Sequence, residues 1–146
     1  MLFIMALLLL FPQLSAQKHK KYARQGNRDY EESNYSDSEM SYRRALEENP
    51  SFNKAVFNLG DALYKQEKYE DAIDNFLELA GREINNNKLA ESYYNLGNSL
   101  LKSGSIEKSI EAYKESLRLD PDNMQTKYNL AYAQDQLRKQ EQQQEQ

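Results

Sequence analysis

Apolar and small residues recur along the middle of the chain with the spacing of one helix face. In two segments these residues are Val56, Leu59, Gly60 and Leu63, and then Tyr93, Leu96, Gly97 and Leu100. Residues at i, i+3, i+4 and i+7 share one side of an α-helix. Each segment therefore predicts a helix that buries this stripe against a partner helix.

The same short string returns at a nearly constant interval. Its small fourth residue falls at Gly26, Gly60, Gly97 and Ala131, with spacings of 34, 37 and 34 residues. Twelve residues after each glycine come Ser38, Ala72 and Ser109, and four residues further come Tyr42, Phe76 and Tyr113. A mid-helix glycine costs about 1 kcal/mol relative to alanine, unless it allows a second helix to approach closely. We expect the small residues to meet the glycines, and the aromatic rings to fill the space between repeats.

Two prolines and one insertion mark the boundaries between repeats. Pro50 and Pro121 follow the first and third repeats at the same offset, and each is expected to end a helix because proline disfavours a helical residue before it. Three extra residues precede the third repeat, where Gly81–Lys88 holds three consecutive asparagines. This segment predicts an irregular, longer turn, either a tolerated insertion or a functional loop.

The pattern resembles the tetratricopeptide repeat family over about residues 19–139. The resemblance implies an all-α solenoid of antiparallel helix pairs. Its three repeats span about 19–52, 53–89 and 90–123 within a domain of residues 17–139, and a capping helix follows at 124–139. The Gln- and Glu-rich end, 140–146, cannot pack a core. We expect it to be disordered or a frayed continuation of the last helix.

The N-terminus is apolar from Met1 to Phe11, and Pro12 follows. About eleven apolar residues are too few to span a bilayer, which takes about 20. This pattern predicts a signal peptide over residues 1–16, cleaved after Ala16, and a protein exported to the periplasm or cell envelope. The alternative is an uncleaved N-terminal membrane anchor, flanked by Lys18, Lys20, Lys21 and Arg24.

Composition argues against several kinds of chemistry. The chain has no cysteine and one histidine, so it offers no thiol nucleophile and no histidine pair for a metal. Its 19 basic and 23 acidic residues argue against nucleic-acid binding through a basic face. Neither a paired-carboxylate pocket nor a glycine-rich phosphate loop is indicated. We therefore expect no enzymatic activity, no cofactor, no metal and no small-molecule substrate.

The helix face opposite the buried stripe is the candidate binding site. In a stacked solenoid the first helices of the repeats line the concave side. Asparagine side chains there can pair with an extended peptide backbone, and aromatic rings add apolar area with few rotors. The alternative is that both serve contacts between repeats. The candidate residues are Asn27, Phe57, Asn58, Asp61, Tyr64, Tyr94, Asn95, Asn98, Tyr128 and Asn129.

Some tetratricopeptide domains clamp the C-terminal carboxylate of a chaperone with lysine, arginine and asparagine. Asn27 and Asn58 match the asparagine positions of that pattern. The cations are missing, because Ala23 stands for the first lysine and Glu91 and Asn95 stand for the later lysine and arginine. A carboxylate would lose its charge-assisted hydrogen bonds, which argues against this ligand.

Longer strings are similar to the small exported tetratricopeptide proteins of the Bat (Bacteroides aerotolerance) operon. They include YARQGNRDY at 22–30, FNLGDALYKQ at 57–66 and KYNLAYAQDQL at 127–137. This resemblance implies a scaffold of the bacterial cell envelope, in a membrane-associated complex with proteins that carry von Willebrand A-type domains and linked to aerotolerance or stress. The alternative function is a periplasmic peptide-binding chaperone or assembly factor.

Overall fold

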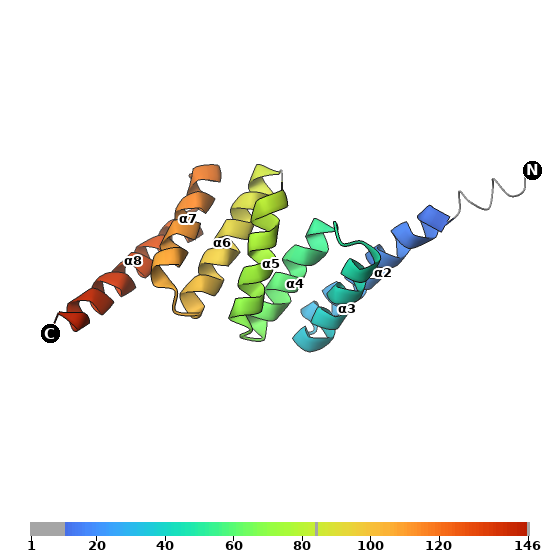
Figure 1. Cartoon of the computed structure of the whole chain (residues 1–146), viewed down its shortest axis with the longest axis horizontal. Helices are drawn as coiled ribbons and strands as arrows, with labels where there is room; N and C mark the ends of the chain where they lie inside the picture. The colour runs from blue at the N-terminus through green and yellow to red at the C-terminus, as the bar shows by residue number, and fades with distance from the viewer. Residues whose placement is uncertain (1–10, 84, 146) are drawn as a thin grey trace, which may run out of the picture. The chain divides into compact units, whose positions relative to one another are not determined.

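The computed structural model describes residues 11–83 and 85–145, with side chains from Gln17 onward, and the chain is helical there (Figure 1). Over these residues it has seven helices and no strand, which confirms the all-α prediction. They are α2 (Phe11–Glu31), α3 (Tyr35–Glu48), α4 (Asn53–Lys65), α5 (Tyr69–Arg82), α6 (Asn86–Lys102), α7 (Ile106–Leu119) and α8 (Met124–Gln144). They form two compact units, an N-terminal unit up to Gln66 and a C-terminal unit from Glu67.

Within each unit, helices that follow one another in the sequence pack together. In the N-terminal unit α2 packs on α3 and α3 on α4, and in the C-terminal unit α5, α6, α7 and α8 pack in the same consecutive manner (Figure 1). The predicted stripe is buried as expected at Val56, Leu59, Gly60 and Leu63. The periodicity therefore identified the core face of α4 correctly.

Close approach of paired helices depends on glycine in both units. A Cβ atom added to Gly26 would lie 2.7 Å from Cε1 of Tyr42, and one added to Gly97 would lie 2.5 Å from Cε1 of Tyr113. The sequence predicted that small residues would meet the glycines. Ser38 does donate a hydrogen bond to the Gly26 carbonyl at 2.9 Å. The ring of the aromatic residue, however, occupies the space that a Cβ would need.

The turn after the first helix of each repeat has one left-handed residue. These residues are Ser33 (φ 62°), Glu67 (φ 60°) and Gly104 (φ 86°), which are equivalent positions in the repeats. After α2, the amides of Ser33 and Asn34 donate to the carbonyls of Tyr30 and Asp29. After α6, the amides of Gly104 and Ser105 donate to Leu101 and Leu100 in the same pattern. This Schellman arrangement satisfies carbonyls that the helix end leaves open.

Helix ends before the prolines agree with the sequence prediction. The helix α3 ends at Glu48 with extended Asn49 (φ −149°) before Pro50, and α7 ends at Leu119 with Asp120 (φ −134°) before Pro121. The irregular turn predicted for Gly81–Lys88 is wrong. Gly81 lies inside α5, and the amide of Lys88 donates to the Asn85 side chain at 3.1 Å as α6 begins. The inserted residues therefore lengthen α6 instead of forming a loop.

The last helix begins at Met124 as predicted and is longer than the predicted capping helix of residues 124–139. Ala131, at the glycine position of the repeat, is exposed. Met124 and Tyr128 are each 72% exposed on the same helix. The helix extends to Gln144, so residues 140–144 continue α8, which is one of the two alternatives that the sequence left open.

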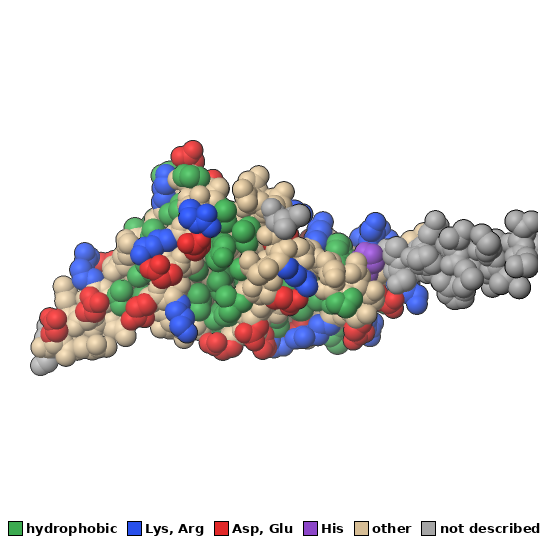
Figure 2. All heavy atoms as spheres, turned by 45° about the horizontal axis from the view of Figure 1, so that its top comes forward, with side chains coloured by type: hydrophobic (Ala, Val, Ile, Leu, Met, Phe, Trp, Pro, Cys, Tyr) green, Lys and Arg blue, Asp and Glu red, His purple; other side chains and the backbone are tan. Residues whose placement is uncertain are grey.

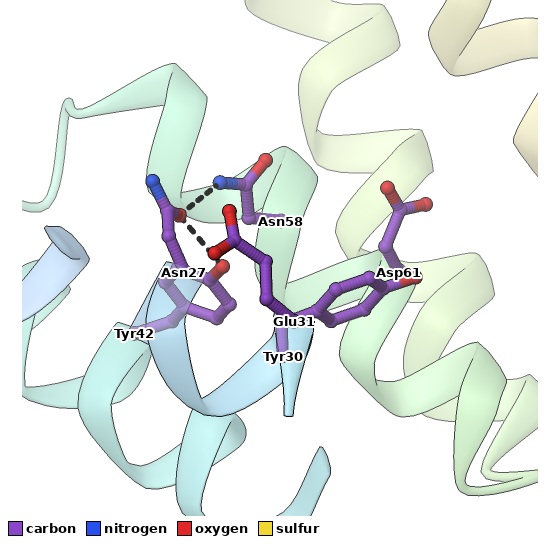
Figure 3. A pocket seen from close by; sticks show the side chains of 6 residues that line it. All are labelled: Asn27, Tyr30, Glu31, Tyr42, Asn58 and Asp61. Atoms are coloured by element: carbon purple, nitrogen blue, oxygen red, sulfur yellow. Dashed lines mark hydrogen bonds between the residues drawn. The ribbon is translucent and has the colours of Figure 1, made fainter. Parts of the chain in front are cut away.

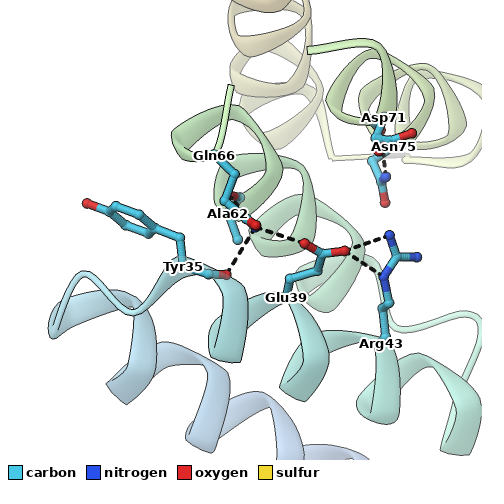
Figure 4. A network of polar contacts seen from close by, with 7 residues as sticks. All are labelled: Tyr35, Glu39, Arg43, Ala62, Gln66, Asp71 and Asn75. Carbon is cyan, nitrogen blue, oxygen red and sulfur yellow. Dashed lines mark hydrogen bonds and ion pairs between the residues drawn. The ribbon is translucent and has the colours of Figure 1, made fainter. Parts of the chain in front are cut away.

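Gln66 closes the N-terminal unit by joining the end of α4 to the start of α3. Its side-chain nitrogen lies 2.8 Å from a carboxylate oxygen of Glu39 and 3.2 Å from the carbonyl oxygen of Tyr35 (Figure 4). Glu39 in turn pairs with Arg43 at 3.0 Å on the same helix. This network holds the turn ends of α3 and α4 together.

The predicted signal peptide falls largely outside the described residues. Residues 1–10 are not described, and the backbone of 11–16 is helical and continuous with the rest of α2. Among the described helices, none has the length and apolar character needed to cross a membrane. Cleavage after Ala16 and the alternative of an anchor therefore both stay predictions.

Candidate protein-interaction site

A polar row runs along one face of the first helix of each repeat. On α2 it consists of Lys20, Arg24, Asn27 and Glu31, and on α4 of Lys54, Asn58, Asp61 and Lys65. Each row has the spacing i, i+4, i+7 and i+11, which places its members on one helix face. Each α4 residue lies 34 positions after its α2 counterpart. We call these two rows the N-terminal groove face.

At the centre of this face, Asn27 joins three helices. Its side-chain oxygen accepts a hydrogen bond from the Tyr42 hydroxyl of α3 at 2.8 Å and another from the Asn58 amide of α4 at 3.0 Å (Figure 3). Tyr42 is 2% exposed, so its hydroxyl needs an acceptor within the protein. Asn27 therefore fixes the packing of α2, α3 and α4 around one oxygen atom.

The C-terminal unit contains the same arrangement 71 residues later. The side-chain oxygen of Asn98 accepts from the Tyr113 hydroxyl at 2.8 Å and from the Asn129 amide at 2.9 Å. The Asn129 amide also lies 3.2 Å from the Tyr94 hydroxyl. Both units thus use an asparagine oxygen to join a first helix, its second helix and the next first helix.

Each asparagine pair keeps polar atoms for a ligand. In the N-terminal unit, the nitrogen of Asn27 and the oxygen of Asn58 have no hydrogen-bond partner among the described residues, and in Figure 3 both point away from the bond that joins the two side chains. One donor and one acceptor side by side match the carbonyl and amide of a peptide group. The asparagines therefore serve contacts between repeats, as the alternative interpretation of the sequence proposed, and leave one donor and one acceptor without a hydrogen-bond partner among the described residues.

A pocket of about 170 Å³ lies beside this pair. It is lined by Asn27, Tyr30, Glu31, Tyr42, Asn58 and Asp61 (Figure 3). Burial, together with the negative charge of Asp61, raises the pKa of Tyr30 to about 12. Burial likewise raises the pKa of Tyr42. The pocket therefore holds neutral tyrosines beside two carboxyl groups.

The other predicted site residues differ in exposure. Phe57, Tyr64 and Asn95 are half-buried and interact within the protein. Tyr94 is also half-buried, with its ring centroid 6.2 Å from that of Tyr113. Tyr128 extends into solvent. Each unit thus brings its own predicted residues together, Asn27 with Asn58 and Asp61, and Asn98 with Tyr94 and Asn129.

Three pocket residues were not among the ten candidate binding residues. Tyr30 and Glu31 follow Asn27 by three and four residues, so helical spacing places them on the same predicted face. Tyr42 could not have been added in this way, because it lies on α3 and was expected only to fill space between repeats. Its hydroxyl reaches the groove face because the ring crosses above Gly26.

The described residues show neither the surface typical of a nucleic-acid interface nor a cluster typical of a metal site. Basic and acidic side chains are interspersed over the face shown in Figure 2, which differs from the clustered basic surface that binds nucleic acids. Among the described residues, no group of three or more His, Cys, Asp or Glu side chains is placed to hold a metal ion.

Family models identify the fold family. Models described as tetratricopeptide repeat match residues 23–87 and 90–123. The chain belongs to the tetratricopeptide repeat family, whose members generally serve as non-catalytic binding scaffolds.

The similar proteins are either longer than this chain or single tetratricopeptide domains. The chain is 27% identical over 120 residues to small glutamine-rich tetratricopeptide repeat-containing protein 2 of Mycosarcoma maydis, covering 82% of this chain and 33% of that protein. It is also similar to the Sgt2 tetratricopeptide domain of Aspergillus fumigatus, with a TM-score of 0.77, 16% identity and coverage of 86% and 82%. A third similar structure is the second such domain of human RPAP3 in complex with the HSP70 peptide SGPTIEEVD, with a TM-score of 0.73, 20% identity and coverage of 84% and 98%. The chain spans one third of the length of the fungal relative, and the two structures show the shared fold.

Proposed function

We propose that the chain is a non-catalytic interaction module that binds extended segments of partner proteins along the polar faces of its first helices. The asparagine pair carries this proposal. Asn27 with Asn58, and Asn98 with Asn129, each present an unpartnered donor and acceptor beside the hydrogen bond that joins them. Two such pairs at a 71-residue offset can bind backbone amides with little dependence on side-chain sequence.

Binding to a chaperone C-terminus of the kind in the RPAP3 complex is not favoured. The peptide of that complex ends in EEVD. In this chain Ala23, at the first clamp position, is 7% exposed, and Glu91 is an exposed carboxylate. A buried methyl and a negative charge offer no charge-assisted hydrogen bonds to a terminal carboxylate.

Peptide titration of the ¹⁵N-labelled chain tests the proposed function. A degenerate mixture of acetylated, amidated nonapeptides should shift the side-chain amide signals of Asn27, Asn58, Asn98 and Asn129. The matched control is Asn75, whose amide donates to the Asp71 carbonyl at 2.8 Å within α5. If the signals of Asn75 move as much as the other four, or if none moves, the faces are not the binding site.

We place this module in the cell envelope, as a scaffold in an aerotolerance- or stress-related complex. The support is the apolar stretch Met1–Phe11 before Lys18 and the resemblance of the repeats to the Bat operon proteins. N-terminal sequencing of the protein isolated from its own cells should give Gln17 as the first residue. A chain that starts at Met1 and fractionates with membranes would support the anchor instead.

The partner class is proposed on the same resemblance. A photo-reactive residue at position 128, where the native tyrosine is 72% exposed, should capture envelope proteins with von Willebrand A-type domains. Position 77, where leucine is 51% exposed on α5, provides the control site. Capture of many unfolded exported chains at position 128 would favour the chaperone or assembly factor.

A further inference from the structure

The N-terminal groove face has unlike charges at its two ends. Lys20, Arg24 and Lys54 lie toward the start of α2 and α4, and all three are exposed. Glu31 and Asp61 lie on the other side of the asparagine pair and line the pocket. Lys65 is one turn beyond Asp61 and does not line the pocket. The two ends are therefore a basic end and a carboxylate end separated by Asn27 and Asn58.

Three charged side chains on this face have no ion-pair partner among the described residues. Arg43, Arg118 and Lys114 each form an ion pair with a glutamate three or four residues away. Lys20, Arg24 and Glu31, in contrast, form no ion pair within the described part of the chain. Like charges at i and i+4, as at Lys20 and Arg24, cost a helix stability. An unpaired arrangement of this kind gains most from a ligand that supplies the opposite charges.

The separation of the ends limits the length of such a ligand. Arg24 precedes Glu31 by seven residues and Lys20 precedes it by eleven, which at about 1.5 Å per residue gives about 10–16 Å along the helix. An extended chain covers this distance in about three to five residues at about 3.3 Å each. The backbone between the two charged side chains would then lie across Asn27 and Asn58.

We infer that the N-terminal groove face selects an extended peptide segment carrying one acidic and one basic side chain three to five residues apart. The acidic side chain binds Lys20, Arg24 and Lys54, and the basic side chain enters the pocket beside Glu31 and Asp61. This inference rests on the proposed function, because it specifies the ligand of the same surface. It adds charge selection, which the asparagine pairs do not provide.

The C-terminal unit supplies an internal reference. At the positions equivalent to Lys20 and Glu31, α6 has Glu91 and Lys102, so its charge order is reversed. On α8 the positions equivalent to Lys54 and Lys65 hold Gln125 and Gln136, which are uncharged. The pair of Asn98 and Asn129 has fewer charged residues beside it and should therefore show weaker charge selection than the N-terminal unit.

The experiment compares four nonapeptides of one scaffold in a ¹⁵N titration of the whole chain. The four peptides differ only at two positions that lie four residues apart, and their termini are blocked. These positions carry one Glu with one Lys in the first peptide, two Gln in the second, two Glu in the third and two Lys in the fourth. The Glu and Lys peptide should shift the Asn27 and Asn58 side-chain amides with a Kd about three- to tenfold below that of the Gln peptide at low salt. This difference should disappear at high ionic strength, and at Asn98 and Asn129 it should be smaller at low salt.

Two charge-neutral double variants complete the test. Arg24→Gln with Glu31→Gln should weaken the preference, whereas Lys114→Gln with Glu111→Gln, which removes an ion pair on α7, should leave it unchanged. Equal Kd values for the Glu and Lys peptide and the Gln peptide, or tighter binding of the Glu and Glu peptide, overturn the inference while the proposed function stands. If none of the four peptides shifts the asparagine amides of either unit, the proposed function itself fails.

Discussion

The side-chain nitrogen of Asn58 lies 3.0 Å from the side-chain oxygen of Asn27, although 31 residues separate them in the sequence. Asn129 and Asn98 repeat this relationship at 2.9 Å and at the same separation. One asparagine oxygen in each unit therefore supports both the stability of the helix packing and the geometry of the candidate binding edge.

Replacing this acceptor should destabilise the fold. Asn27→Ala leaves the buried Tyr42 hydroxyl without its acceptor, which should lower the free energy of unfolding by about 1–3 kcal/mol in urea titration. Asn27→Asp keeps an oxygen acceptor and should cost much less. The control Asn75→Ala loses only a local bond on α5. Equal losses in Asn27→Ala and Asn75→Ala would contradict the joining role of Asn27.

Replacing the glycine at the α6–α7 contact with alanine should lower the stability of the fold. Gly97→Ala places a Cβ about 2.5 Å from the Tyr113 ring, and this overpacking should cost about 1–3 kcal/mol although alanine is the better helix former. Gly81→Ala is the matched control, because nothing lies within 4 Å of its Cβ position. It should raise stability by about 0.5–1 kcal/mol in thermal or urea unfolding. A stable Gly97→Ala variant would show that the helix pair is looser than described.

The left-handed turn residues offer stabilising substitutions. A residue with a Cβ loses roughly 1–2 kcal/mol in this conformation, so Ser33→Gly and Glu67→Gly should each stabilise by up to about 1 kcal/mol. Gly104→Ala should have the opposite sign. Unfolding free energies measured in urea would show all three effects. Stabilisation by Gly104→Ala would mean that the turn does not need a positive φ.

Ionisation of Tyr30 should weaken the fold at high pH. Its pKa is raised from 10.0 to about 12 in the folded state, so its contribution to stability is full below pH 10 and is lost between pH 10 and about 12. Replacing Asp61 with Asn should lower this pKa, because the neighbouring negative charge disappears. NMR of ¹³C-labelled tyrosine, with Tyr30→Phe to assign the signal, measures the titration. A Tyr30 pKa unaffected by Asp61→Asn would show that burial and the neighbouring Tyr35 and Tyr42, and not Asp61, raise it.

The sequence predicted the helices well because repetition supplied several independent signals for each one. At Gly26 and Gly97 a side chain would collide with an aromatic ring, and proline restricts the residue before it to non-helical conformations, so few residue types fit these positions. The role of Asn27 was harder to predict, since a polar residue on an outer helix face can bind either a ligand or a neighbouring helix. The side-chain oxygen of Asn27 binds the neighbouring helices through Tyr42 and Asn58, and we propose that its side-chain nitrogen binds the ligand.

The error at the predicted turn over Gly81–Lys88 has a physical cause. An asparagine-rich stretch with a glycine is typical of a loop, yet Asn85 became the cap of α6 and Gly81 stayed in α5. The packing of α5 and α6 determined the structure of this stretch, and the local sequence pattern does not contain that information.

The short connection between α5 and α6 has a practical consequence for handling the protein. The turn inside each repeat keeps its left-handed residue at Ser33, Glu67 and Gly104, whereas the extra residues of the chain were accommodated at the start of α6, after the C-cap Glu83 and the N-cap Asn85. The extra residues of this chain therefore lie between two repeats, and the turn inside each repeat keeps its length. A fluorescent label, an affinity tag or a tethered peptide would be best inserted beside Asn85.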